Sequence, residues 1–419
     1  MFDKKILIST LSFIFPPFGR VRVGSLPSLG RGWGWGLLLL AVLLLAACKD
    51  DDELPLIALP DYSAAQTIII IQPYTQSLSS ELAQNIRDIK QNIITHGGLR
   101  NSRLMLCQAN TSSSATLKEL YYANGTVQEI TIKEYRNFKL AGKDNFATVL
   151  KDAKQQIMNS ESHYSLIIGC HGMGWVPSAT YFHTSEYFGG DGTNTHTETY
   201  ELADAIDEAG MHMDFILFDD CYMACVEVAY DLRNVTDYLL ASPAEIMNYG
   251  LPYADLFHYL TVLPQDYASV MTAFKNFYTT YRSPHGTYAT IDCGEVEEMA
   301  ALMKAVNDND IFDFTQESQL QVYDGMIVNG SYKHVFYDMG DYTSRLCSDA
   351  SLSARLANCL QRLVPYKATT GTFFSKYDGL YHTVNVFSGI SISDPTTNYR
   401  FTPSLHDTQW WKATHTVVE

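Results

Sequence analysis

The sequence predicts an α/β fold in which helices cover both faces of a mostly parallel central sheet. Residues 67–71 form a continuous run of β-branched residues, which is typical of a strand buried on both faces. Further strand-like runs alternate along the chain with helical segments of about 10–15 residues, the pattern of parallel α/β folds. Aromatic residues make up 12% of the 419 residues, which excludes a mainly disordered chain.

The first half of this fold is predicted from apolar runs for strands and from apolar spacing of three and four residues for helices. In chain order we expect a strand at 67–71, a helix at 79–94, a strand at 103–107, a hairpin over 120–132, a helix at 145–158 and a strand at 165–169. The hairpin is indicated by Asn124-Gly125, a dipeptide that favours a two-residue turn.

The second half continues the alternation and then changes character. We expect a helix at 198–209, a strand at 215–218, a helix at 223–232 and a strand at 238–242, then mainly helices up to about residue 307 with a strand near 287–291, and finally β-strands at 370–374 and 384–392. The sequence therefore predicts a core at 65–250 and a smaller α+β part at 251–419 that completes or covers it.

Residues 1–47 are typical of a signal peptide rather than of a folded segment. Their apolar run, 36–47, would rise only about 18 Å as a helix, short of the roughly 30 Å hydrocarbon core of a membrane. Leu45-Ala46-Ala47-Cys48 resembles the lipobox of bacterial lipoproteins, in which the cysteine is lipidated and becomes the new N-terminus. The alternative is an ordinary signal peptide followed by a chance cysteine.

Residues 48–64 are predicted to be an acidic tether. The run Lys49-Asp50-Asp51-Asp52-Glu53 also resembles the acidic tag of some surface-exposed outer-membrane lipoproteins. We therefore expect a lipoprotein of the bacterial outer membrane that is exposed at the cell surface and anchored through Cys48.

The charge and the cysteine pattern exclude several classes of function. The formal net charge is −17, and it becomes −21 without residues 1–47, so the surface is unsuited to nucleic acid. The cysteines after Cys48 are scattered and include no CxxC pair, which argues against a zinc site and a disulfide scaffold. The absence of HxxH and HExxH pairs argues against a metal-dependent hydrolase.

Two of the predicted buried strands are followed directly by chemically active residues. His171 follows the strand at 165–169, and Cys221 follows the strand at 215–218. Since ligands bind beyond the carboxyl ends of parallel strands, the two side chains can meet if their strands are neighbours. Each residue alone is more often structural, but as a pair they predict a thiolate nucleophile with a general acid/base beside it.

The backbone around this pair is also suited to catalysis. The N–H groups of Gly172 and Cys221 are candidates for an oxyanion hole. Cys221 is expected at the mouth of a helix that begins near Met223, where the helix dipole favours a thiolate. His171 precedes Cys221 by fifty residues, a spacing that matches the caspases.

Here the sequence resembles the clostripain family of cysteine peptidases, family C11, whose members share a caspase-like fold. The resemblance rests on residues 170–175 (CHGMGW) and 218–223 (FDDCYM), continues through 227–232 and 238–242, and is weaker at 338–342 and 387–392. It implies a caspase-like α/β/α sandwich, a catalytic dyad of His171 and Cys221, and protein or peptide substrates. It implies no metal site and no required cofactor, although some relatives bind Ca²⁺, and we expect a monomer.

The family also suggests how substrates are selected. Asp219 matches the acid that favours Arg or Lys before the scissile bond, and strand alternation points it the same way as Cys221. Capping of the next helix is the alternative for either acid, and we prefer that role for Asp220. Further candidates for substrate contact are Trp175, which could instead pack in the core, and Ser242 and Glu245.

One departure from the family leaves a second function open. Relatives often mature by cutting themselves after a basic residue between the His and the Cys, yet residues 172–220 contain no Lys and no Arg. The alternative to an active peptidase is therefore a catalytically weak or inactive caspase-like surface protein that binds peptides or proteins.

Overall fold

The computed structural model describes residues 64–156, 163–177, 188–191, 195–281, 284–328 and 330–416. The expected signal peptide, the lipobox with Cys48, and the tether up to residue 63 lie outside the described residues. None of the helices in the described ranges has the length and apolar character needed to cross a membrane.

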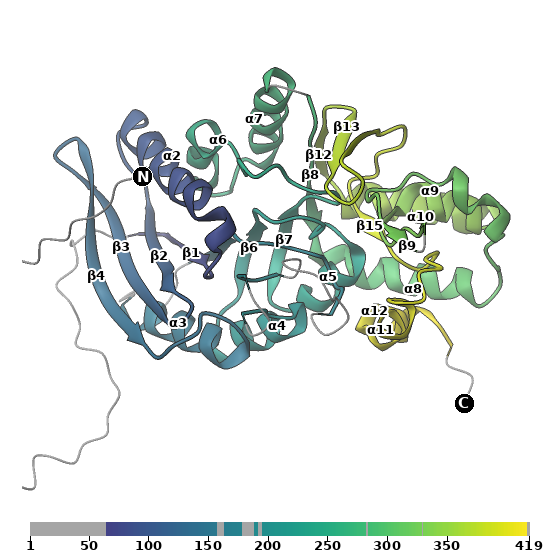
Figure 1. Ribbon diagram of the computed structural model, residues 1–419, viewed down its shortest axis with the longest axis horizontal. Coiled ribbons are helices and arrows are strands. Elements are labelled where there is room, and N and C mark those ends of the chain that lie inside the picture. The colour runs from purple at the N-terminus through teal and green to yellow at the C-terminus, as the bar shows by residue number, and fades with distance from the viewer. Residues whose placement is uncertain are drawn as a thin grey trace, which may run out of the picture. The chain divides into compact units, whose positions relative to one another are not determined.

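A nine-stranded sheet forms the centre of the fold, in the order β12-β8-β7-β6-β5-β1-β2-β3-β4 (Figure 1). The strands from β7 to β2 in this order pair in parallel, and the strands outside them pair antiparallel. The bounds are β1 Gln66–Gln72, β2 Ser102–Thr111, β3 Ser114–Ala123, β4 Thr126–Arg136, β5 His163–Ile168, β6 Met213–Phe218, β7 Thr236–Ala241, β8 Thr287–Asp292 and β12 Tyr366–Thr369. The predicted mostly parallel sheet is confirmed.

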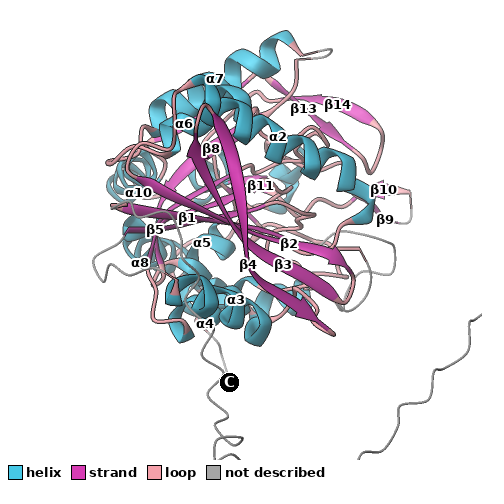
Figure 2. Cartoon of the chain, turned by 90° about the vertical axis from the view of Figure 1, so that its left-hand side faces the viewer, coloured by secondary structure: helices cyan, strands magenta, loops and turns pink. Residues whose placement is uncertain are grey.

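Helices cover both faces of this sheet (Figure 2). One face carries α2 (Ser79–Thr95), α6 (Tyr253–Leu260) and α7 (Tyr267–Thr280). The other carries α3 (Lys143–Gln155), α4 (Thr199–Glu208), α5 (Val226–Leu232) and α8 (Val296–Asn307). The result is the expected α/β/α sandwich.

The run of isoleucines in β1 shows why the sequence folds into three layers. Ile68 and Ile70 pack with the helices of the first face, while Ile69 and Ile71 pack with those of the second. All four are 0–2% exposed. Burying one such side chain contributes about 1.5–3 kcal/mol, so a strand that is apolar on both sides is stabilised by both layers.

Residues after 250 extend the same sheet, because β8 pairs with β7 and β12 pairs with β8. The remaining elements are η1 Gln76–Leu78, η3 Cys293–Glu295, η4 Phe314–Gln319, β9 Ile327–Val328, β10 Ser331–Tyr332, β11 Tyr337–Asp338, α9 Met339–Leu346, α10 Ala350–Leu363, β13 Thr372–Ser375, β14 Leu380–Thr383, β15 Ser391–Ile392, α11 Thr402–Asp407 and α12 Gln409–Thr414.

The strand expected at 384–392 is wrong for most of its length, since only β15 forms there. Side chains satisfy the backbone of this segment instead of a neighbouring strand. The Asn385 N–H donates to Gln321, the Ser388 N–H donates to Asp338, and the Lys367 ammonium donates to the carbonyls of Phe387 and Ser388.

Candidate active site

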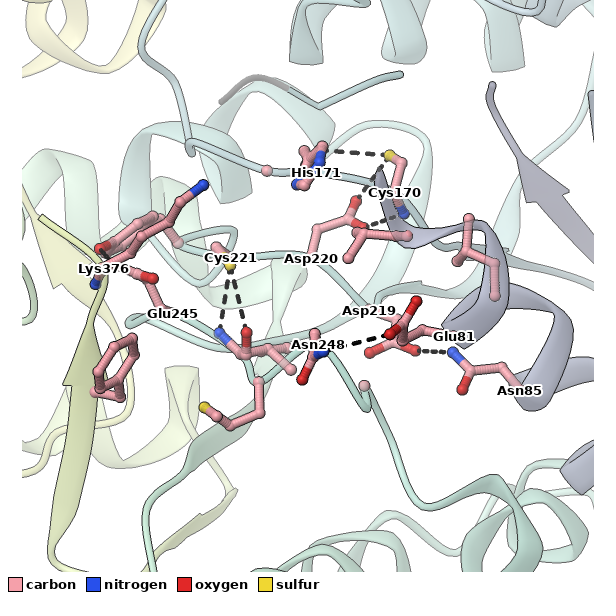
Figure 3. Close-up of a pocket in the computed structure, with 18 residues that line it drawn as sticks. Glu81, Asn85, Cys170, His171, Asp219, Asp220, Cys221, Glu245, Asn248 and Lys376 are labelled. Atoms are coloured by element: carbon pink, nitrogen blue, oxygen red, sulfur yellow. Dashed lines mark hydrogen bonds between the residues drawn. The ribbon is translucent and has the colours of Figure 1, made fainter. Parts of the chain in front are cut away.

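His171 and Cys221 follow two neighbouring parallel strands, as the sequence predicts. β5 and β6 pair so that Ile168 lies opposite Phe218, and each reactive residue comes three positions after its member of that pair. Both residues line one cavity of about 330 Å³ (Figure 3). Its other lining residues are Leu78, Glu81, Leu82, Asn85, Cys170, Gly172, Asp219, Asp220, Tyr222, Glu245, Ile246, Met247, Asn248, Gly250, Phe374 and Lys376.

Gly172 brings the His171 loop into direct contact with the backbone of Cys221. A Cβ atom at this position would lie 2.5 Å from the Cys221 carbonyl oxygen and 3.1 Å from the Cys221 nitrogen. Only glycine therefore fits without moving Cys221. Among the described residues, no backbone carbonyl accepts a hydrogen bond from the Gly172 N–H.

The Cys221 side chain is held by the segment that follows β7. Its Sγ accepts a hydrogen bond from the Ile246 N–H at 3.3 Å and lies 3.7 Å from the Ile246 carbonyl oxygen. The next residue, Tyr222, has a φ of 62°, an uncommon conformation for an aromatic residue that costs of order 1–3 kcal/mol. Cys221 thus sits on a sharp turn.

The helix expected from Met223 begins only at Val226, with Cys225 as its N-cap residue. The N–H groups of Tyr222 and Ala224 donate to the carbonyls of Ala244 and Ser242, so the intervening segment is tied to the chain after β7 and cannot be helical. The expectation that Cys221 lies at a helix mouth is therefore wrong, and the described donor to its sulfur is the Ile246 N–H.

The imidazole of His171 lies between charged groups of opposite sign. Its Nε2 is 2.8 Å from the Ser77 hydroxyl and 3.5 Å from Asp191, while Lys376 approaches from the β13–β14 hairpin. Burial lowers the pKa of His171, Asp191 opposes this shift, and the charge of Lys376 adds to it. The imidazole is therefore mainly neutral at neutral pH and can act as a base.

Asp219 directly follows β6 and, like Cys221, forms part of the cavity wall (Figure 3). It is 8% exposed, and its carboxylate accepts hydrogen bonds from the Asn85 amide at 3.0 Å and the Leu251 N–H at 2.9 Å. Gly250 covers it so closely that a Cβ there would lie 2.6 Å from Asp219 Oδ2. Burial raises the pKa of Asp219 to about 7, and its hydrogen bonds with Leu251 and Tyr253 limit the rise.

Asp220 does not cap the following helix, so the role preferred for it from the sequence is wrong. Its carboxylate instead accepts hydrogen bonds from the backbone N–H of Cys170 at 2.6 Å and the Cys170 thiol at 3.4 Å. Burial raises the pKa of Asp220 well above its usual range. Asp220 therefore joins the ends of β5 and β6.

Two of the expected substrate contacts are not available in the structure. Trp175 is 5% exposed and donates from its indole N–H to Ser393 within the core. Ser242 is fully buried, and its hydroxyl bonds to Thr287 rather than facing the cavity. Neither lines the cavity. For Trp175 the structure favours the alternative of packing in the core, and for Ser242, which directly follows β7, it corrects the prediction.

Glu245 lines the cavity, as expected for a residue that contacts substrate, but one of its oxygens has a structural role. Its Oε1 accepts hydrogen bonds from the Tyr222 hydroxyl at 2.8 Å and from the Lys376 N–H at 2.7 Å. Glu245 therefore connects the turn after Cys221 to the β13–β14 hairpin.

Several residues of the site were not predicted. Ser77, Glu81 and Asn85 come from η1 and α2, Asp191 comes from the segment before α4, and Lys376 comes from a hairpin far along the chain. Each is an ordinary polar residue in its local sequence. The sequence pattern indicated functional residues at the ends of β5 and β6, but not at these positions.

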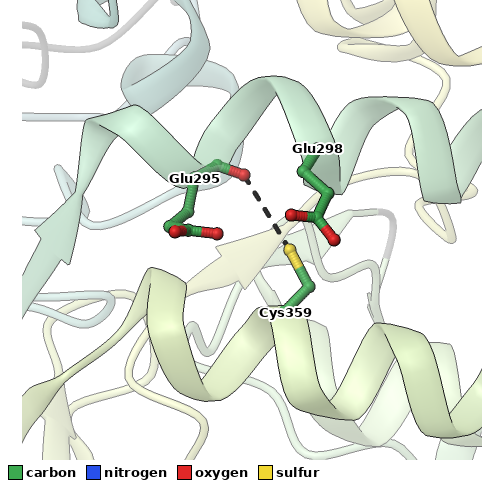
Figure 4. A group of neighbouring side chains, drawn as sticks. All are labelled: Glu295, Glu298 and Cys359. Atoms are coloured by element: carbon green, nitrogen blue, oxygen red, sulfur yellow. Dashed lines mark hydrogen bonds between the residues drawn. The ribbon is translucent and has the colours of Figure 1, made fainter.

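A second cluster of possible ligands lies away from this cavity, where Glu295 and Glu298 approach Cys359 (Figure 4). The Arg362 guanidinium forms ion pairs with both carboxylates, at 2.9 and 2.5 Å. A thiol is a poor ligand for Ca²⁺, which prefers oxygen, and the arginine already balances the acids. The cluster fits a structural link between α8 and α10 better than a Ca²⁺ site.

Comparison with known proteins identifies relatives of the whole fold. A family model described as the clostripain family, Peptidase_C11, matches residues 78–378. A secreted C11 cysteine protease of Bacteroides thetaiotaomicron, "iotapain", is 38% identical with a TM-score of 0.78, and the match covers 84% of this chain and all of that one. No curated protein matches the chain.

Two further solved structures are similar. An inactive zymogen C11 protease from Parabacteroides distasonis is 27% identical with a TM-score of 0.73, over 85% of this chain and all of that one. A clostripain from B. thetaiotaomicron in complex with the peptide inhibitor BTN-VLTK-AOMK is 44% identical with a TM-score of 0.52, over 55% of this chain and all of that one. The chain belongs to the clostripain family and is a C11 cysteine peptidase.

Proposed function

We propose that the protein is an endopeptidase that cleaves after Arg or Lys, with Cys221 as nucleophile and His171 as general acid/base. The observation that carries the proposal is the convergence of Cys221, His171 and the buried carboxyl of Asp219 on one cavity. A nucleophile and its acid/base in one cavity supply the reaction, and a carboxyl beside them supplies the selectivity.

The residues of the cavity suggest the order of events. His171 takes the thiol proton, and the Cys221 sulfur attacks the carbonyl carbon of the scissile bond. The N–H groups of Gly172 and Cys221 stabilise the negative oxygen that develops, which is worth roughly 10²–10³ in rate per donor. The C–N bond then breaks as the leaving amine takes the proton from His171. Water, deprotonated by the same imidazole, attacks the thioester carbonyl, the C–S bond breaks, and the proton returns from His171 to the Cys221 sulfur.

The preference for a basic residue follows from the acids on the cavity wall. Asp219 lies deep among Asn85 and Gly250, and Glu81 lines the same cavity from α2. A guanidinium or ammonium there would gain charge-assisted hydrogen bonds in surroundings that contain little water. The inhibitor bound to the 44% identical clostripain ends its peptide VLTK in a lysine, which supports this preference.

The location of the enzyme is also part of the proposal. Relatives are described as secreted, and the Leu45-Ala46-Ala47-Cys48 lipobox leads us to propose a lipid anchor at Cys48, on the outer membrane and facing outward. A Cys48→Ser variant should move from the membrane fraction to the soluble fraction. Retention of that variant in the membrane would contradict the anchor.

The activity is tested with a fluorogenic peptide library that varies the residue before the scissile bond. The parent chain should prefer Arg and Lys, Cys221→Ala should be inactive, and Cys347→Ala should keep full activity as a control for loss of a cysteine elsewhere. Asp219→Ala should lose the basic preference but still react with small electrophiles at Cys221. Peptide cleavage that survives in Cys221→Ala would overturn the assignment.

A peptide-binding protein without turnover gives a different result. It would bind basic peptides but would not be labelled at Cys221 by an acyloxymethyl ketone that carries Lys. Stoichiometric labelling of Cys221, found by peptide mapping, would argue for the peptidase.

A further inference from the structure

A chain of hydrogen bonds leads away from the imidazole of His171 on the side of Nε2. The Ser77 hydroxyl lies 2.8 Å from His171 Nε2 and 2.8 Å from Asp191 Oδ1. The other oxygen of Asp191 accepts the Ser77 backbone N–H, also at 2.8 Å. Ser77 is therefore held by both carboxylate oxygens and presents its hydroxyl to the histidine.

The direction of these bonds follows from the number of protons available. A carboxylate only accepts, so Ser77 donates its single hydroxyl proton to Asp191. The serine oxygen can then only accept from His171, which requires the imidazole proton to be on Nε2. In the neutral ring the free lone pair is consequently on Nδ1, and Nδ1 is the nitrogen left to exchange a proton with Cys221.

Backbone hydrogen bonds and a close backbone contact fix the position of Asp191. The N–H and carbonyl of Gly189 bond to the carbonyl and N–H of His171, at 3.0 and 3.2 Å, and the Asp191 N–H donates to the Tyr74 carbonyl at 3.0 Å. A Cβ on Gly190 would lie 1.9 Å from that Tyr74 oxygen, so this position admits no side chain. The segment before α4 is thus fixed to both the histidine and the η1 region.

We propose that Ser77 and Asp191 are positioning residues for His171, which set its tautomer and orientation and stabilise the imidazolium formed during the reaction. This rests on the proposed dyad. When Nδ1 takes the proton of the Cys221 thiol, the S–H bond breaks and an N–H bond forms, and the ring becomes positive opposite Asp191. When the amine leaves, the same proton passes from Nδ1 to nitrogen, and the ring returns to the Nε2–H form.

Among the residues that the structure describes, the charged groups that act on the imidazole are Asp191 from the segment before α4 and Lys376 from the β13–β14 hairpin, and the titratable Cys221 lines the same cavity from the end of β6. Asp191 raises the pKa of His171 and Lys376 lowers it. Removal of the negative charge in Asp191→Asn should therefore shift the acidic limb of the pH–rate profile to lower pH. Lys376→Met should shift it to higher pH.

The experiment compares variants of the full mature chain in peptide cleavage and in alkylation of Cys221 by iodoacetamide, both as a function of pH. Asp191→Asn should lower kcat roughly 10- to 100-fold with little change in KM, because general acid/base catalysis is affected and binding is not. Ser77→Ala should lose less, since Asp191 is already 3.5 Å from Nε2 and can approach it. Ser77→Thr should restore activity by keeping the hydroxyl.

Asp207→Asn, on the exposed side of α4, and Ser79→Ala, two residues after Ser77, are the matched controls and should behave like the parent. The proposal is overturned if Asp191→Asn keeps parental kcat, or if it loses activity through a lower melting temperature with an unshifted pH limb. Alkylation is read by peptide mapping and needs no peptide substrate. If no peptide is cleaved but the alkylation profile shifts as expected, the proposed function fails while the positioning role stands.

Discussion

At the scale of single residues, Asp219 combines two requirements that conflict. In the proposed function its carboxylate selects a basic side chain, but its burial beneath Gly250 makes the charged form costly. Three neighbouring donors only partly offset this cost, and the pKa of Asp219 is raised to about 7. A pKa of about 7 means that protonated and charged forms of Asp219 coexist near neutral pH.

Selectivity for a basic residue should therefore depend on pH. A lysine side chain stays charged up to about pH 10, so the ratio of kcat/KM for a Lys peptide to that for a norleucine peptide follows the charge of the acids on the cavity wall, among which Asp219 has a pKa raised to about 7. Titration of His171 and Cys221 cancels in this ratio. We expect the ratio to rise as pH increases through about 7 and to become flat above it, measured with two otherwise identical fluorogenic peptides.

The Asp219→Asn variant is the control for this prediction. It should show a low ratio that does not change with pH, because the amide neither titrates nor attracts the cation. A parental ratio that is constant between pH 5 and 9 would mean that Asp219 is not the group that selects a basic residue before the scissile bond.

At the scale of elements, the β13–β14 hairpin is fastened to the nucleophile turn through Glu245. The hairpin contributes Phe374 and Lys376 to the cavity, although it lies some 150 residues after Cys221 in the chain. Glu245 accepts both the Tyr222 hydroxyl and the Lys376 N–H on one oxygen. This contact both steadies the strained Tyr222 and sets the position of the hairpin.

Loss of this Glu245 oxygen should leave the β13–β14 hairpin and the Tyr222 turn less firmly held on either side of the cavity. We expect Glu245→Ala to raise KM and lower kcat by about tenfold each, since small displacements of catalytic groups are costly. Glu245→Gln keeps a carbonyl oxygen as acceptor and should remain within about twofold of the parent. Steady-state kinetics on one Lys peptide gives both values. Equal impairment of the two variants would indicate that activity depends on the negative charge of Glu245 rather than on its hydrogen bonds to Tyr222 and Lys376.

The site could be predicted from the sequence only where a strand carried the signal. His171, Cys221 and Asp219 follow runs whose burial and alternation are visible in the sequence, so their meeting could be inferred. Ser77, Asn85 and Lys376 reach the cavity through tertiary packing of elements that carry no chemical motif. The late start of α5 was likewise hidden, since it depends on hydrogen bonds from Tyr222 and Ala224 to the chain after β7.

At the scale of the whole molecule, acidic groups are buried where the end of the chain packs on the core. Glu227 of α5 is 1% exposed and accepts the Ser393 N–H at 2.8 Å. Asp394 accepts the indole N–H of Trp410. Burial raises the pKa of Glu227 to about 8 and that of Asp394 to about 7. His415, 4.0 Å from Asp394, is kept neutral because burial lowers its pKa to about 4.

These acids make stability fall as pH rises. Below about pH 4 they are protonated in both the folded and the unfolded chain, but between about pH 4.5 and 8 the folded chain retains protons that the unfolded chain has released. Each such proton lowers the free energy of unfolding by at most about 1.4 kcal/mol per pH unit. Urea denaturation of the parent should therefore show decreasing stability from pH 5 to 8 and a plateau above it.

Glu227→Gln keeps the acceptor for Ser393 without a titrating proton, so it should flatten that decline, whereas Asp207→Asn on the surface should leave it unchanged. An equally steep decline in Glu227→Gln would show that Glu227 is already ionised in the folded protein.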